Sequence, residues 1–215
     1  MDGLPHEKRR NGKNVGLRRR IGYNELESVF LVRTGRGNRM SSKTEERIKA
    51  LEIALNNESR ERDFYLNHSK RTKNDMGKKM FASIAGDEEE HYQRILGLHK
   101  KLKEEGKWPE TVPIQVKGTE VKAVIQKVAD AAAASSVADR DDLEAVKTAI
   151  DFETKGEAFY GKLAKEVENP MEKKFYELLA SMEREHRISL QDTLDYFKDP
   201  AGWYRIKERH HIDGA

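Results

Sequence analysis

The sequence predicts an all-α fold, a four-helix bundle built from two repeated helix hairpins that a long crossover joins. From Ser41 onward, apolar residues recur at steps of three or four, which is typical of helices that bury one face. The chain also matches itself without a gap at an offset of 95 residues, so that Glu58 corresponds to Glu153 and Asn74 to Asn169. Two matching helix pairs with a long connection between them favour a bundle with a pseudo-twofold axis.

The first hairpin is expected to hold helices at about 42–68 and 74–105. Ser42 and Glu45 form a capping box where the first of these helices would begin. After Gly106, further Pro and Gly residues interrupt the helical pattern, and the alanine-rich stretch that follows can form a short helix. This interrupted segment is the predicted crossover.

The second hairpin is expected to hold helices at about 141–168 and 170–197. The start of its second helix is marked by Asn169 at the N-cap, Pro170 at the first helical position and Glu172 at the third.

The chain divides into a basic N-terminal arm at 1–40, the bundle at 41–198 and a C-terminal tail at 199–215. Residues 1–39 contain ten Lys or Arg against four Asp or Glu, a net charge of +6, whereas the rest has 31 against 34, a net charge of -3. The arm has little apolar periodicity, which predicts disorder. It could contact a nucleic acid or an anionic surface. We favour the alternative that Met40 is the natural start and that the upstream residues come from an early start assignment or a cloning vector.

The composition excludes several classes of protein. Of the 215 residues, 36% are hydrophobic and 37% are charged, and no apolar run approaches the length of a membrane span. The N-terminus has no apolar stretch behind its basic residues, so we expect a cytoplasmic protein without a secretory segment. The absence of cysteine excludes disulfides, zinc fingers, thiol catalysis and thiolate-bound iron. Any metal must therefore be held by oxygen and nitrogen.

Polar residues interrupt the apolar stripe of each predicted long helix near its middle. Two helices carry a solitary glutamate there, and the other two carry Glu-x-x-His, which places a carboxylate and an imidazole on one face. An unpaired buried carboxylate costs several kcal/mol, so the same feature in four stripes indicates one shared metal site. The six candidate ligands are Glu58, Glu88, His91, Glu153, Glu183 and His186.

This set of donors has a known counterpart among helical bundles. One glutamate from each of two helices and Glu-x-x-His from each of the other two form the ligand set of ferritin-like dinuclear bundles. Four carboxylates balance the charge of two divalent ions, and oxygen-rich ligation with two imidazoles suits two iron ions. Manganese or a mixed pair would fit the same ligands, and affinity alone does not exclude zinc. Without metal, the crowding of like charges should raise the pKa values of some of these carboxylates.

Over about residues 43–197, the sequence resembles the rubrerythrin-like branch of the ferritin-like superfamily, without a rubredoxin domain. The resemblance rests on the Glu, Phe-Tyr and Glu-x-x-His residues of both halves. It implies that each solitary glutamate is a terminal ligand, that the glutamate of each Glu-x-x-His pair bridges the irons, and that each histidine binds one iron. It also implies that hydrogen peroxide is reduced with electrons from a separate rubredoxin-type protein.

The chain departs from the rubrerythrin pattern at Gly156, where those proteins carry an extra glutamate on the third helix. The matching residue of the first helix is Glu61, which lies on the inward stripe. We hypothesise that Glu61 is a mirrored extra carboxylate for which Gly156 leaves space, and that it ligates the diferric centre and withdraws on reduction. Alternatively, Glu61 points to solvent or pairs with Arg62 or Arg94. Glu157 is a weaker candidate for the extra carboxylate.

Aromatic and histidine residues near these motifs complete the candidate site. Tyr65 and Tyr160 lie two turns beyond the solitary glutamates, where they could orient ligating carboxylates or relay single electrons, or could be ordinary core residues. In the tail, Trp203 and Tyr204 are expected to cover a bundle end or a dimer contact. Four further histidines are expected at the surface: His68, His99, His210 and His211.

Three functions fit these observations. The leading one is a di-iron oxidoreductase that reduces hydrogen peroxide, or oxygen less efficiently, with electrons from an external donor such as a rubredoxin; Glu61, Tyr65 and Tyr160 would take part in catalysis. The second is a ferroxidase that oxidises Fe(II) and passes it on for storage. The third is a non-enzymatic, metal-stabilised helical adaptor. We expect a homodimer that binds neither membranes nor nucleic acid.

Overall fold

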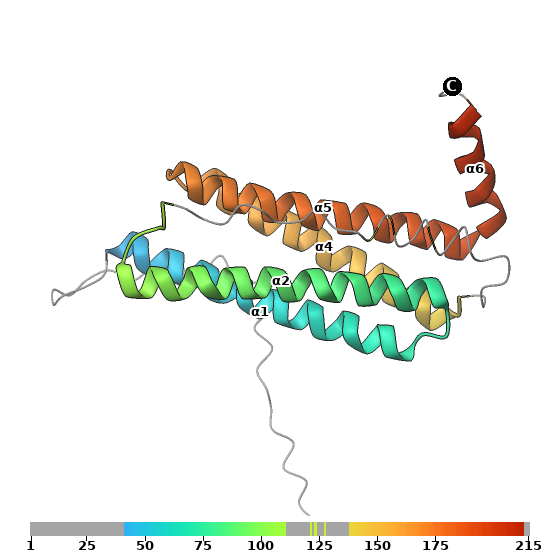
Figure 1. The fold of residues 1–215 in the computed structure, drawn as a ribbon, viewed down its shortest axis with the longest axis horizontal. Coiled ribbons are helices and arrows are strands. Elements are labelled where there is room, and N and C mark those ends of the chain that lie inside the picture. The colour runs from blue at the N-terminus through green and yellow to red at the C-terminus, as the bar shows by residue number, and fades with distance from the viewer. Residues whose placement is uncertain (1–40, 111–120, 122, 124–126, 128–137, 213–215) are drawn as a thin grey trace, which may run out of the picture. The chain divides into compact units, whose positions relative to one another are not determined.

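A computed structural model describes residues 41–110, 121, 123, 127 and 138–212, and over these residues it confirms the predicted all-α fold. Four long helices and a shorter one at the C-terminal end make up this part of the chain, and Figure 1 shows how they are arranged. They are α1 (Ser42–Arg71), α2 (Asp75–Glu105), α4 (Arg140–Glu166), α5 (Pro170–Lys198) and α6 (Pro200–Ile212). The predicted arm and the alanine-rich stretch of the predicted crossover lie outside the described residues.

Side chains cap the first turns of the long helices. The side chains of Asn74 and Asn169, which correspond in the repeat, accept backbone hydrogen bonds where α2 and α5 begin. The cap of α1 differs from the predicted box that begins at Ser42. Its N-cap is Ser41, whose side-chain oxygen accepts a hydrogen bond from the backbone N–H of Thr44 at 3.3 Å.

The helices of each hairpin pack closely along their lengths, α1 on α2 and α4 on α5 (Figure 1). Only residues 72–74 and 167–169 connect the partners, so the two helices of each hairpin run antiparallel. The hairpins meet through contacts of α1 with α4 and of α2 with α5. The buried faces of all four long helices therefore surround one interior.

That interior is apolar towards both ends of the bundle. At one end, Phe81 and Leu194 belong to a buried hydrophobic cluster with Trp203. At the other end, the ring of Trp108 lies 5.9 Å from the ring of Tyr176. The apolar ends keep water away from the middle of the bundle, where the polar residues gather.

Residues 200–212, which the sequence analysis treated only as a tail, form α6. Trp203 is 5% exposed, and its indole N–H donates a hydrogen bond to Asp192 Oδ1 at 2.9 Å. The rings of Trp203 and Tyr204 pack against Tyr196 at 5.5 and 6.0 Å. These two residues therefore cover one end of the bundle, which is one of the two positions expected for them. In the part of the chain that the structure describes, no helix combines the length and apolarity needed to cross a membrane.

Candidate metal centre

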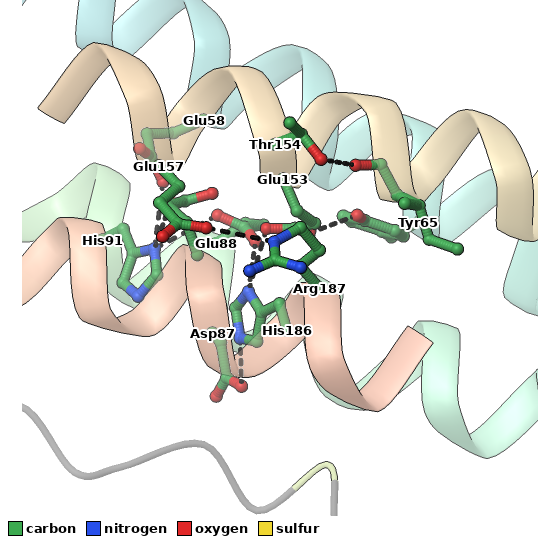
Figure 2. A network of polar contacts seen from close by, with 12 residues as sticks. Glu58, Tyr65, Asp87, Glu88, His91, Glu153, Thr154, Glu157, His186 and Arg187 are labelled. Carbon is green, nitrogen blue, oxygen red and sulfur yellow. Dashed lines mark hydrogen bonds and ion pairs between the residues drawn. The ribbon is translucent and has the colours of Figure 1, made fainter. Parts of the chain in front are cut away.

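Six polar side chains meet in the middle of the bundle, and each is at most 1% exposed. Figure 2 shows Glu58, Glu88, His91, Glu153 and His186 converging from the surrounding helices. The set is Glu58 from α1, Glu88 and His91 from α2, Glu153 from α4, and Glu183 and His186 from α5. The structure therefore brings together all six residues that the sequence singled out as candidate ligands.

The first group of donor atoms surrounds His91. Its Nδ1 lies 3.1 Å from an oxygen of Glu58 and 3.1 Å from an oxygen of Glu88. An oxygen of Glu183, from the other hairpin, lies 3.9 Å from the same nitrogen. Each of these four residues offers one atom, and those atoms all lie within 4.8 Å of one another.

The second group surrounds His186. Its Nδ1 lies 3.2 Å from an oxygen of Glu88 and 3.5 Å from an oxygen of Glu153. The donor atoms of these three residues also lie within 4.8 Å of one another. Glu88 belongs to both groups, with one oxygen directed to each histidine, which is the arrangement that a bridging carboxylate needs. Glu183 belongs only to the first group in this structure, so its expected bridging role stays a prediction.

Several atoms of the two groups have no hydrogen-bond partner among the described residues. They are Glu88 Oε1, Glu153 Oε2, His186 Nδ1 and both carboxylate oxygens of Glu183. A buried polar atom without a partner is destabilising, and a metal ion would supply the missing interaction. Four carboxylates and two imidazoles also match the oxygen-rich coordination of iron or manganese. The residues present therefore fit a pair of such ions.

The crowding of these groups shifts pKa values in the metal-free protein, as expected from the sequence. Burial, followed by the charges of neighbouring carboxylates, raises the pKa of Glu183 well above its ordinary value. Burial raises the pKa of Glu58 to about 7, although the hydrogen bond with His91 opposes this shift. Burial lowers the pKa of His91, but the charge of Glu88 and the hydrogen bonds with both glutamates outweigh it and raise the pKa to about 10. The metal-free site therefore retains protons that a metal must displace.

The comparison with protein families decides to which family this site belongs. The family model described as Rubrerythrin matches residues 49–135 and 144–210, which include all six residues of the cluster. The chain belongs to the rubrerythrin family. This places it in the ferritin-like di-iron superfamily, and the buried cluster is the candidate iron site. Comparisons with curated proteins and with solved structures found no match.

The two histidines of this rubrerythrin-family site differ in the surroundings of their second ring nitrogen, Nε2. His186 Nε2 lies 3.0 Å from Asp87 Oδ2 (Figure 2). His91 Nε2 has no hydrogen-bond partner among the described residues, and the repeat places Met182 where Asp87 would be expected. A carboxylate on Nε2 holds the imidazole so that Nδ1 is free to bind metal. Asp87 is not among the site residues predicted from the sequence; the difference between positions 87 and 182 of the repeat does not identify His186 as its partner.

Each of the two predicted tyrosines contacts a glutamate of the opposite hairpin. The Tyr65 hydroxyl on α1 donates a hydrogen bond to Glu153 on α4, and the Tyr160 hydroxyl on α4 donates one to Glu58 on α1. Burial, and then the charge of the glutamate that each tyrosine contacts, raises both tyrosine pKa values well above the ordinary value. Both hydroxyls therefore keep their protons and hold the two carboxylates in place.

The carboxylates considered for an extra ligand lie in different surroundings. Glu61 is 4% exposed, so it does not point to solvent, and its charge acts on Tyr65, Tyr160 and Glu183. Glu157 instead pairs with Arg184 and Arg187 at 2.7 and 3.0 Å.

The space next to Gly156 is occupied by Glu183. The three atoms nearest to the position of an added Cβ all belong to Glu183. Gly156 therefore leaves room for the carboxylate of Glu183, and the role of Glu61 as an extra ligand stays a prediction.

Two of the histidines that were expected at the surface are partly covered. The ring of His68 lies 4.2 Å from the ring of Phe64. His99 Nε2 lies 3.2 Å from a carboxylate oxygen of Glu52, and the His99 side chain is 12% exposed. The side chains of His210 and His211 lie outside the described part of the structure. His68 and His99 do not belong to the two candidate metal groups found among the described residues.

Proposed function

We propose that this protein is a non-haem di-iron oxidoreductase that reduces hydrogen peroxide with electrons from a separate donor protein. The observation that carries the proposal is the buried double cluster, in which Glu88 contributes to both groups of donor atoms. Two irons, one on each side of a shared carboxylate, can deliver the two electrons that cleavage of the peroxide O–O bond requires. Membership of the rubrerythrin family supports the same class of chemistry.

Each of the two groups would hold one iron. Glu58, His91 and Glu183 would hold the first, Glu153 and His186 would hold the second, and Glu88 would contribute to both. When bound, the iron pair would supply a Lewis acid and a source of two electrons. The carboxylates keep the site close to neutral, which allows it to bind divalent ions in an apolar interior.

The surrounding side chains would orient the ligands and move protons. The hydroxyls of Tyr65 and Tyr160 hold the carboxylates of Glu153 and Glu58, so they fix where those oxygens can bind metal. Glu61 is buried, and its charge acts on both tyrosines, so it is placed close to the centre. It would carry protons towards the oxygen that leaves as water.

The test is anaerobic loading of the full chain with Fe(II), followed by stopped-flow mixing with peroxide and, separately, with oxygen. We expect two irons per chain and faster iron oxidation by peroxide than by oxygen. The variant E183Q should lose iron binding, whereas E185Q, which changes an exposed carboxylate on the same helix, should behave as the wild type. Failure of peroxide to oxidise the bound iron would refute the proposal. Uptake of many irons per chain during aerobic loading would instead indicate an iron-handling protein.

The electron donor and the oligomeric state also belong to this proposal. The chain contains no cysteine that could form a rubredoxin-type iron site, so the electrons would come from another protein. A homodimer is the expected assembly. Sedimentation of the iron-loaded chain, with and without a reduced rubredoxin, tests both expectations.

A further inference from the structure

A second tyrosine lies beyond Tyr160 in only one half of the repeat. The rings of Tyr160 and Tyr176 stack, with centroids 6.4 Å apart and an interplanar angle of 16°. In the other half, Tyr65 stacks on Phe81 with centroids 6.1 Å apart and an angle of 28°. Phe81 and Tyr176 occupy the same position of the repeat. Because Phe81 satisfies the same packing, packing alone does not account for the hydroxyl of Tyr176.

The residue one turn before Tyr176 also differs between the halves. Glu172 is fully buried on α5, and its carboxylate pairs with Arg47, whose Nε lies 3.0 Å and whose Nη2 lies 2.6 Å from its oxygens. The matching residue of the first half is Gly77, where an added Cβ would lie 3.3 Å from Phe197 and 3.3 Å from Thr72. One half therefore has a tyrosine and a carboxylate where the other half has a phenylalanine and a glycine.

The carboxylate lies close enough to Tyr176 to interact with it electrostatically. Burial raises the pKa of Tyr176, and the negative charge of Glu172 raises it further. Burial raises the pKa of Glu172, and the ion pair with Arg47 opposes this shift, so Glu172 is a carboxylate that can accept a proton one turn from a buried phenol. The Arg47 side chain is 25% exposed, whereas that of Glu172 is fully buried.

A continuous chain of oxidisable groups thus leads away from the cluster in one direction. The Tyr160 hydroxyl donates a hydrogen bond to Glu58, and the Tyr160 ring stacks on the ring of Tyr176. The ring of Tyr176 in turn lies 5.9 Å from the ring of Trp108, measured between centroids. In the first half, the matching chain reaches Phe81, whose ring lacks a hydroxyl and is far harder to oxidise than a phenol.

We propose that Tyr176 is a redox-active residue that supplies single electrons, through Tyr160, to the metal centre. The proposal rests on the proposed function, because hydrogen peroxide is the oxidant. Reduction of one peroxide to two waters takes two electrons and two protons. A fully reduced iron pair supplies both electrons, but a pair that holds only one reducing equivalent leaves one electron missing.

Tyr176 would supply that missing electron. Its ring loses one electron to the centre and its phenol proton passes to Glu172, which leaves a neutral tyrosyl radical. The two protons that complete the waters reach the centre from solvent. A small one-electron reductant such as a thiolate then restores Tyr176, and the proton returns from Glu172. Because Tyr176 supplies the missing electron, the iron centre does not take it from its own ligands.

The test uses the full iron-loaded chain after partial oxidation, mixed with hydrogen peroxide and freeze-quenched for EPR spectroscopy. We expect a radical signal that narrows when the protein carries ring-deuterated tyrosine. Y176F, which introduces the residue found at the matching position of the first half, should lower the radical yield several-fold. F81Y, which adds a phenol without a neighbouring carboxylate, should leave the yield at the wild-type level. Circular dichroism and iron content establish that both variants fold and load.

Three results would overturn the inference. An undiminished radical yield in Y176F would assign the radical to another residue, and a raised yield in F81Y would remove the role of Glu172. Iron oxidation by peroxide without any tyrosyl radical in the wild type would contradict the inference while leaving the proposed function intact. A wild-type centre that peroxide does not oxidise would instead refute the proposed function, and this inference with it.

Discussion

Gly156 on α4 lies directly against the carboxylate of Glu183 on α5. A Cβ at position 156 would lie 2.6 Å from Glu183 Oε2 and 3.0 Å from Glu183 Cδ, both closer than van der Waals contact allows. The glycine therefore sets where this carboxylate can lie, although it contributes no side chain to the cluster.

The first prediction follows from this contact. In G156A, the added methyl group should push the Glu183 carboxylate out of its group, so that the chain binds fewer than two irons or binds them more weakly. Anaerobic Fe(II) titration measures the change. G161A is the matched control, because nothing lies within 4 Å of its added Cβ on the same helix. It should bind iron normally and be stabilised by roughly 0.5–1 kcal/mol. Equal iron binding by the two variants would show that the contact is unimportant.

The second prediction concerns the carboxylate behind His186. D87N should weaken metal binding at the His186 group by about 10- to 100-fold, because the imidazole loses its anionic partner. Titration with Co(II), which reports on its ligands through its absorption spectrum, measures the affinity. E89Q makes the same chemical change two residues away, where the carboxylate binds Arg62 at 2.6 Å, and should leave the affinity unaltered. If D87N binds as tightly as E89Q, Asp87 does not support the metal site.

Residues that interrupt a strong pattern could be predicted from the sequence. The six cluster residues were found because each is a polar residue within an apolar stripe, and burial makes such a residue costly unless it has a partner. The helix ends at Asn74 and Asn169 were found because capping is decided by local sequence.

Features that depend on how helices are placed against one another could not be predicted. Asp87 is 24% exposed and lies off the apolar stripe, so nothing in its own helix marks it as a partner of His186. Two further contacts also join different helices: Gly156 lies against Glu183, and Tyr65 donates a hydrogen bond to Glu153. The N-cap of α1 at Ser41 was missed because Ser41 and Ser42 are both good capping residues, and only backbone geometry separates them.

The third prediction tests Glu61. E61A should slow peroxide turnover by about 100-fold, as expected for loss of a proton-transferring group, and should change the absorption spectrum of the oxidised centre if the carboxylate also binds iron. E157A is the control, because Glu157 pairs with arginines outside the cluster. Unchanged spectra and unchanged turnover in E61A would show that Glu61 is neither an extra ligand nor a proton carrier.

The fourth prediction concerns the ion pair at the end of the bundle. R47A leaves the fully buried carboxylate of Glu172 without its cation, so the free energy of unfolding should fall by about 3 kcal/mol. Urea unfolding followed by circular dichroism measures it. K43A is the control. It removes the exposed ion pair of Lys43 with Glu168, which lies one turn before Arg47 and Glu172 in the sequence, and it should not measurably change the free energy of unfolding. Comparable losses in both variants would mean that burial of Glu172 is not the cause.

The fifth prediction is that the metal-free protein becomes less stable as the pH rises. The pKa of Glu58 is raised to about 7 and that of His91 to about 10, so the folded state keeps protons that the unfolded chain releases earlier. The free energy of unfolding should therefore fall between about pH 5 and about pH 10. Urea unfolding of chelator-treated protein at several pH values measures this trend. A stability that rises with pH over the same range would contradict the assigned protonation states.

The most direct measurement is diffraction from crystals of the iron-loaded protein at wavelengths on either side of the iron absorption edge. The account predicts two anomalous peaks within the bundle, one beside Glu58 and His91 and one beside Glu153 and His186, with Glu88 between them. Peaks confined to the protein surface, or no peak among these side chains in protein that contains iron, would contradict it.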